Sequence, residues 1–127
     1  MKMKILLGIL AFLAILGALF AVPVPADLSG TWIGKTTIPN GTQDDMTLVL
    51  KKAGATYTGT LVDSLGMIPQ DTELNDVKLD KNELTANFAI ADGTPIKFKL
   101  TVNGDKMNGQ WEDPGGSTGV LEFEKKK

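Results

Sequence analysis

The chain has 127 residues with 13 basic and 15 acidic side chains, and it contains no histidine and no cysteine. Every basic residue is a lysine, and the formal net charge of −2 at pH 7 argues against nucleic-acid binding, which needs a basic face. Without histidine or cysteine the chain cannot carry Ser–His or Cys–His catalysis, disulfides, thiol chemistry or the usual zinc and copper sites.

Residues 1–26 have the features of an export leader. Two lysines precede an uninterrupted apolar run that ends at Val22, and small residues at Ala21 and Ala26 provide two cleavage contexts. We expect a signal peptide cleaved after Ala26, with cleavage after Ala21 as the second choice. An uncleaved membrane anchor is the alternative, because the run is at the short limit for crossing a bilayer. The leader predicts a periplasmic, extracellular or cell-envelope protein that meets the membrane only through an uncleaved leader.

The remaining residues, 27–127, are enough for one domain with one core. Turn signals recur about every ten residues, a spacing typical of β-sandwiches and barrels. No stretch has the apolar spacing of an amphipathic helix. We therefore predict an all-β fold, a single antiparallel up-and-down β-barrel of about eight strands, preceded by the apolar leader as a helix. The expected strands are 29–38, 45–52, 55–63, 73–80, 83–91, 95–103, 106–112 and 117–125, with 66–70 as an edge piece or a loop lid.

Side chains alternate along the best of these strands. Leu84, Ala86 and Phe88 share one face of a strand, while Thr85 and Asn87 share the other. Such alternation indicates a sheet with one buried face and one wet face. Short turns between successive strands favour a meander, and closing the meander removes exposed edges.

One short pattern occurs three times: a strand, a polar turn, and a strand with a small residue between two large apolar ones. Small inward residues let a sheet curve and close on itself. They either leave space for a ligand or serve only the curvature. The three copies span 48–61, 77–88 and 100–111, and the small inward residues are Gly34, Gly59, Ala86 and Gly109.

The segment Leu28-Ser29-Gly30-Thr31-Trp32 resembles the opening strand of the lipocalin and avidin group of small calycin-type barrels. In those families a Gly-x-Trp packs its indole across the closed end of the barrel, which the resemblance implies for Trp32. Residues 57–61 and 107–111 are also similar to avidin strands. Residues 107–123 fit the close of a wider group of exported bacterial barrels of unassigned function, which ends with a Gly-x-Trp strand, a Gly-rich turn and a short final strand.

Three departures from the avidin pattern concern ligand contacts. The polar contact that follows the first tryptophan falls on Gly34, the tyrosine contact on Leu61, and the tryptophan of a later strand on Met107. The resemblance therefore does not imply biotin binding.

We expect a non-enzymatic barrel without cofactor or metal that binds a small apolar or amphipathic ligand. A barrel of eight strands is just wide enough to be filled by its side chains or to hold one small ligand. Trp111 lies beside a Gly-rich turn at a strand end, where ligands commonly enter barrels. The candidate ligand-binding residues are Tyr57, Leu61, Phe88, Phe98, Met107 and Trp111, with Leu84 beside them.

The alternative function is a protein-interaction module, such as an inhibitor of an extracytoplasmic enzyme or a structural component of the envelope. Residues 64–76 would form its contact loop, with Leu65, Met67 and Ile68 as apolar anchors. Those three side chains could instead cover one end of the barrel.

A carboxylate-based hydrolase is the third hypothesis. The acidic groups at Asp44-Asp45 and around Asp71 to Asp76 could bind Ca²⁺ or supply a general acid and base. Turns favour Asp for backbone reasons, so we expect solvated turns at both places. No pair of acids is obviously held on adjacent strands pointing inward, which makes catalysis the weakest of the three hypotheses.

Overall fold

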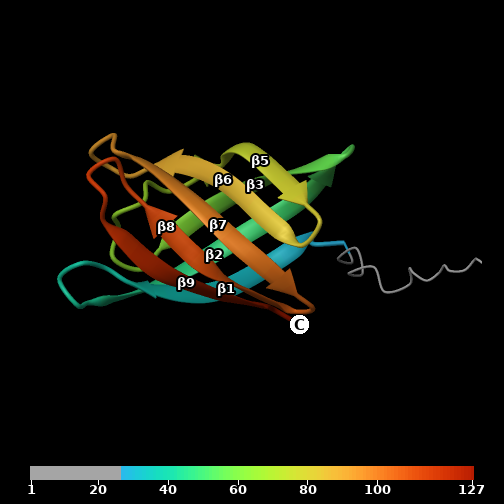
Figure 1. The fold of residues 1–127 in the computed structure, drawn as a ribbon, viewed down its shortest axis with the longest axis horizontal. Helices are drawn as coiled ribbons and strands as arrows, with labels where there is room; N and C mark the ends of the chain where they lie inside the picture. The colour runs from blue at the N-terminus through green and yellow to red at the C-terminus, as the bar shows by residue number, and fades with distance from the viewer. Residues whose placement is uncertain (1–26) are drawn as a thin grey trace, which may run out of the picture.

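The computed structural model describes residues 27–127, so the expected leader helix and its cleavage lie outside the described residues. Nine antiparallel strands form a single sheet in the order β4-β3-β2-β1-β9-β8-β7-β6-β5, and the described part of the chain contains no helix. The sheet coils into a barrel (Figure 1). The strands are β1 (Gly30–Thr37), β2 (Gln43–Ala53), β3 (Thr56–Asp63), β4 (Thr72–Glu73), β5 (Asn75–Asp80), β6 (Glu83–Ala89), β7 (Pro95–Asn103), β8 (Lys106–Glu112) and β9 (Thr118–Lys125).

Strand β1 joins the first and last parts of the domain. It pairs antiparallel with β2 on one side and with β9 on the other. Every other hydrogen-bonded pair in the sheet joins strands that follow one another in the chain. This is the up-and-down order that the short turns predict, with one long-range pairing that curls the meander around.

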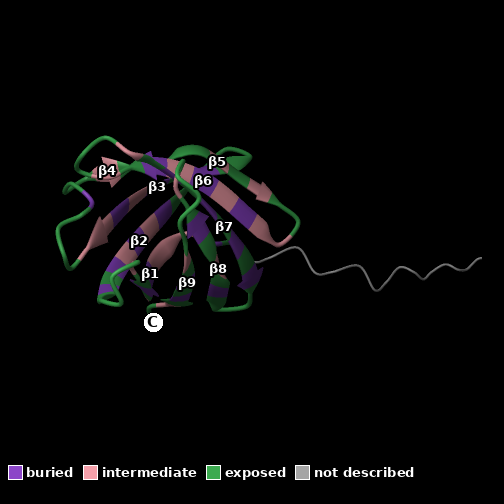
Figure 2. Ribbon diagram, turned by 60° about the vertical axis from the view of Figure 1, so that its left-hand side comes forward, coloured by how far each residue is buried: buried purple, intermediate pink, exposed green. Residues whose placement is uncertain are grey.

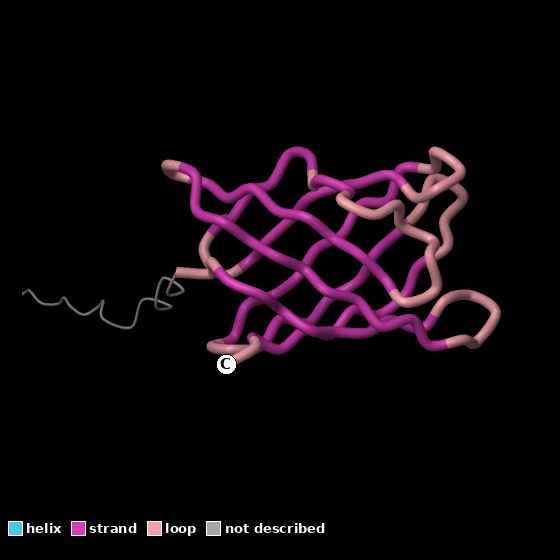
Figure 3. Tube along the Cα trace, turned by 180° about the vertical axis from the view of Figure 1, so that it is seen from behind, coloured by secondary structure: helices cyan, strands magenta, loops and turns pink. Residues whose placement is uncertain are grey.

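The barrel is nearly closed where β3 meets β5 (Figure 3). The Thr56 hydroxyl donates to the Val77 carbonyl at 2.8 Å, and the Leu74 amide donates to the Gly59 carbonyl at 2.9 Å. The prediction of one strand over 73–80 is wrong, because Leu74 separates β4 from β5. The chain changes partner there, from β3 to β6, and the Leu74 side chain turns into the core.

The two ends of the barrel differ. We call one the loop end, formed by the turns 38–42, 90–94 and 113–117 and by the loop 64–71, and the other the plug end, where residues 27–29 enter (Figure 1). Trp32 is fully buried next to residues 27–29, and its indole N–H donates to the Leu28 carbonyl at 3.0 Å. This agrees with the core position that the family resemblance implies.

Burial alternates along the strands (Figure 2). In β7, Phe98 and Leu100 are buried, whereas Lys97 and Lys99 are exposed. The same pattern in β6 confirms the predicted inner and outer faces. Each large apolar side chain removed from water contributes roughly 1.5–3 kcal/mol to folding.

The inward glycines are packed against neighbouring residues. A Cβ at Gly34 would overlap the Phe123 ring, and one at Gly109 would overlap the Lys99 carbonyl. A Cβ at Gly59 would meet leucine side chains at 2.9 and 3.0 Å. The absence of a side chain therefore allows neighbouring strands and side chains to approach closely, and it leaves no room for a ligand at these three positions.

The close approach at Gly109 predicts a stability effect. Because the added methyl meets backbone on β7, we expect Gly109→Ala to lower the free energy of unfolding by about 1–3 kcal/mol. Gly115→Ala is the control, since its nearest atom would be an ordinary 3.5 Å away. Urea denaturation measures both variants, and equal midpoints would contradict the close-packing role of Gly109.

Candidate functional site

An apolar pocket of about 190 Å³ lies at the loop end of the barrel. Strands β1, β2, β6, β7 and β8 supply its walls, and the loop 64–71 covers one side. Inward side chains collect here because the strands alternate, and the turns around them leave the barrel end partly open. The apolar wall consists mainly of Met46, Ile68, Phe88, Ile90, Ile96 and Trp111.

Trp111 is held in one position by hydrogen bonding and packing. Its indole N–H donates to the Thr36 hydroxyl at 2.9 Å, and that hydroxyl donates to the Val120 carbonyl at 2.6 Å. The ring lies against Gly119 on the paired strand β9, where any side chain would overlap it. The indole therefore gives the pocket a rigid aromatic wall, and its polar N–H is already satisfied.

Two of the six predicted ligand-binding residues line this pocket, and a third packs behind them without lining it. Phe88 and Trp111 line it directly. Phe98 is paired with Trp111 across β7 and β8, and its ring centroid lies 6.1 Å from that of Phe88. The three aromatic side chains form one group, of which Phe88 and Trp111 reach the pocket.

The other three predicted residues lie farther down the barrel. Leu61 lies near the end of β3 and is paired with Leu48 in the middle of β2, one inward position deeper than Met46. Tyr57 is the second residue of β3 and lies at the plug end, where its hydroxyl accepts a hydrogen bond from the Leu28 amide at 3.0 Å. Met107 is fully buried beside the plug-end turn that joins β7 to β8. None of the three lines the loop-end pocket.

Asp44 holds the first part of the loop. Its Oδ1 accepts hydrogen bonds from the Ser64 amide at 3.2 Å, the Ser64 hydroxyl at 3.1 Å and the Leu65 amide at 3.2 Å. Asp44 is only 3 % exposed and also lines the pocket. This buried carboxyl thus connects the loop to the pocket wall.

Asp63 holds the next part of the loop. Its two carboxyl oxygens accept from the Met67 and Ile68 amides, each at 3.0 Å. On the far side, the Ala91 amide donates to the Met67 carbonyl at 2.8 Å, which ties the loop to the turn between β6 and β7. The loop therefore reaches across the loop end from β3 to β6.

The apolar side chains of the loop differ in exposure, and both Met67 and Ile68 line the pocket. Ile68 is buried and lines the pocket, whereas Leu65 and Met67 are 45 % and 36 % exposed. The predicted contact loop 64–76 is shorter than expected, because residues 72–73 and 75–80 belong to strands. Ile68 covers the barrel end, as the alternative interpretation expected.

The prediction that Asp44 lies in a solvated turn is wrong. Asp44 points inward from β2, and its carboxyl lies next to that of Asp63 at the end of β3. The expectation that no two acids meet from adjacent strands is therefore also wrong. The sequence already indicated this position, because Asp44 is two and four residues from the inward Met46 and Leu48 and therefore lies on the same face of the strand. The second acidic group, Asp71, Glu73 and Asp76, is exposed as expected.

Burial in the pocket wall, together with hydrogen bonding and repulsion from Asp63, raises the pKa of Asp44 from 3.8 to about 6. The folded protein then binds a proton more tightly than the unfolded chain does. The stabilisation from this proton is complete below pH 3.8 and is lost as the pH rises toward and through 6.

Asp44→Asn removes this titration while keeping an oxygen for the loop amides. We expect the melting temperature of Asp44→Asn to match that of the unmodified protein near pH 4 and to exceed it progressively up to pH 7. The gain is on the order of 1 kcal/mol, or several degrees, because water at the pocket mouth screens the charges. Thermal melts at several pH values measure the difference, and a constant difference would contradict the assignment.

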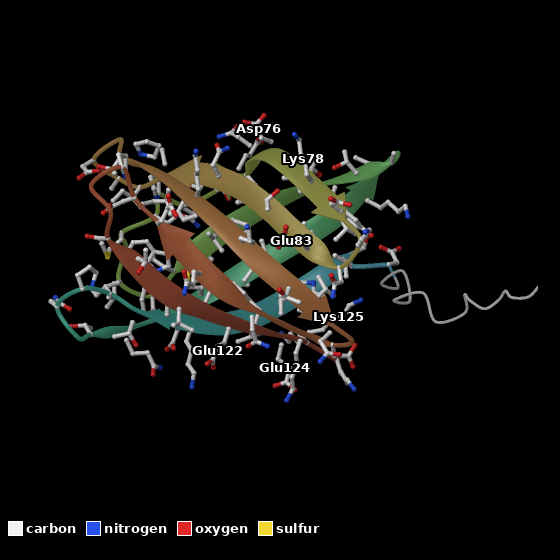
Figure 4. All side chains as sticks on the ribbon, in the orientation of Figure 1. Asp76, Lys78, Glu83, Glu122, Glu124 and Lys125 are labelled. Carbon is white, nitrogen blue, oxygen red and sulfur yellow. The ribbon has the colours of Figure 1, made fainter. Side chains whose placement is uncertain are left out.

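The outer face of the barrel carries mixed charge. Asp76, Lys78, Glu122 and Glu124 point outward from β5 and β9 (Figure 4). A larger hollow of about 610 Å³ lies over the outer face of β5 to β8, and its lining includes three lysines, two acids and two amide side chains. Residues 27–127 contain no group of acids suited to a metal ion and no helix long and apolar enough to span a membrane. The apolar pocket at the loop end is the better candidate site.

No protein-family model matches the sequence, and no curated protein matches it. Solved β-barrels resemble its structure. A redesigned β-barrel matches with a TM-score of 0.62 and 12 % identity, over 79 % of this chain and 92 % of that one. A de novo designed fluorescence-activating β-barrel matches with a TM-score of 0.58 and 17 % identity, over 77 % and 93 %. A mutant of the fluorescent protein UnaG matches with a TM-score of 0.48 and 17 % identity, over 79 % and 96 %. At these identities the first two comparisons establish the barrel fold alone.

Proposed function

We propose that this protein is a non-enzymatic, calycin-like barrel that holds one small apolar or amphipathic molecule in the pocket at the loop end. The pocket itself carries the proposal: an apolar recess with a rigid Trp111 wall and the partly exposed Met67 at its rim. Small-molecule sites are typically concave and apolar, with a few polar groups that orient the ligand.

The size of the pocket limits the ligand. A volume of about 190 Å³ is close to the roughly 150 Å³ of an apolar cavity that accepts benzene, and it is below the range of drug-sized sites. Filled packing at Gly34, Gly59 and Gly109 leaves a ligand no room at these points deeper in the barrel. The proposed ligand therefore has one or two rings or a short chain.

A binding role without catalysis fits the hydrogen bonding of the acids. Both oxygens of Asp63 and one oxygen of Asp44 accept from the loop 64–71, so these carboxyls serve to position the loop. Residues 1–26 support an exported location through their leader-like sequence. An exported barrel of this kind would capture its ligand outside the cytoplasm.

Toluene titration tests the proposal. We expect saturable binding, with amide NMR shifts concentrated at Phe88 and Ile96 in the pocket wall. Ile90→Phe fills part of the pocket and should weaken binding about tenfold or more. Ile33→Phe is the matched control, because Ile33 is 46 % exposed on the outside of β1. Shifts scattered over the outer face, or equal affinities for the two variants, would refute the assigned site.

The second candidate is the protein-interaction module, which the exposure of Leu65 and Met67 favours. Leu65 separates the two functions better than Met67, because Met67 also lines the pocket. If the loop is a docking surface, Leu65→Asp abolishes capture of a partner and leaves toluene affinity unchanged. Retained capture by Leu65→Asp would remove this candidate.

A further inference from the structure

The polar groups of the pocket point to a particular class of ligand, an inference that rests on the function proposed above. We infer that the natural ligand is a small apolar amine whose protonated amino group faces Asp44. Three observations support this: the donors of the pocket wall are already engaged, the wall carries acidic side chains, and the ion pairs found within residues 27–127 do not involve these acids.

Hydrogen-bond donors around the pocket are already engaged. The Trp111 indole N–H donates to Thr36, and the Thr36 hydroxyl donates to Val120. The amides of residues 64, 65, 67 and 68 donate to the carboxyls of Asp44 and Asp63. All three loop hydrogen bonds to Asp44 go to Oδ1, so Oδ2 takes part in none of them. The polar groups of the wall are therefore carboxylate oxygens and donors that are already engaged, so a polar ligand must bring its own donor.

The charge of the wall is negative and lacks a counter-ion. Asp44 and Asp113 both line the pocket, and Asp63 adjoins Asp44. The ion pairs found within residues 27–127 join Lys99 to Glu83 and Lys127 to Asp105, so neither involves these three acids.

A buried carboxylate without a paired cation is costly even where loop amides donate to it, and a charged hydrogen bond offsets that cost. An ammonium group in the pocket would supply both the charge and the donor. A ligand carboxylate would instead add a further negative charge beside Asp44. The apolar wall would hold the hydrocarbon part of either molecule, so the polar end decides the preference.

Three probes of nearly equal shape test the inference: benzylamine, toluene and benzoate, titrated at pH 8, where the Asp44 carboxyl is ionised. Calorimetry and amide NMR shifts report affinity and location. We expect benzylamine to bind about tenfold or more tightly than toluene, with benzoate weakest. Benzoate binding at least as tight as benzylamine would overturn the inference.

Asp44→Asn should bind benzylamine and toluene with nearly equal affinity. Asp45→Asn is the control, because it removes the same charge from the outer face of the same strand. Loss of the amine preference in both variants would show a general charge effect and overturn the assignment to Asp44. If Asp44→Asn does not fold, the three probes on the unmodified protein still decide the question.

The outcomes separate this inference from the proposed function. Absence of pocket binding by all three probes would refute the binding function itself. Binding of all three with similar affinity would support an apolar pocket and refute the amine preference. Ordered affinities that vanish in Asp44→Asn alone support both.

Discussion

The structure depends on the alternation of side chains in a sheet that curls back on itself. Every second residue of each strand points into the barrel, so the core is decided by which of the two alternating sets of residues faces inward. β1 makes this choice common to the domain, because it pairs with β2 on one side and β9 on the other. Glycines at crowded inward positions then let neighbouring strands and rings approach, as Gly34 does for Phe123. The middle of the barrel is consequently packed by its own side chains, and the apolar recess lies at the loop end.

The same alternation puts Asp44 inside the barrel, where its carboxyl does two things. It accepts hydrogen bonds from the start of the loop 64–71, and it forms part of the pocket wall. Asp63 accepts from the next amides of the loop, and the Ala91 amide donates to the Met67 carbonyl on the other side of it. Two carboxyls close together, one of them buried, are unfavourable by themselves. Their position is maintained by the loop amides they bind, so the loop, the acids and the pocket form one arrangement.

Much of the fold could be predicted from local signals. Turn residues and period-two alternation located the strands of the meander. The proline-containing segment 66–70 is part of a loop, which is one of the two structures predicted for it. The break at Leu74 was not predicted: Asn75 and Asp76 favour turns, and Asp76 has a φ of 53°, but local signals do not say that the chain changes its partner strand there. Phe88, Phe98 and Trp111 were found as large inward residues, yet Tyr57 and Met107 carry the same signal and lie at the plug end. Position along the barrel axis depends on register, which one strand alone does not contain.

By itself, the sequence determined the fold class, the inward faces of the best strands and the classes of chemistry that a chain without histidine or cysteine cannot perform. These follow from composition and from short-range periodicity, which act within a few residues. Only the tertiary structure decided that Asp44 meets Asp63, that the inward glycines are packed and that the apolar recess lies at the loop end. Each of these depends on pairing between residues distant in the chain, because register sets which side chains share a level of the barrel.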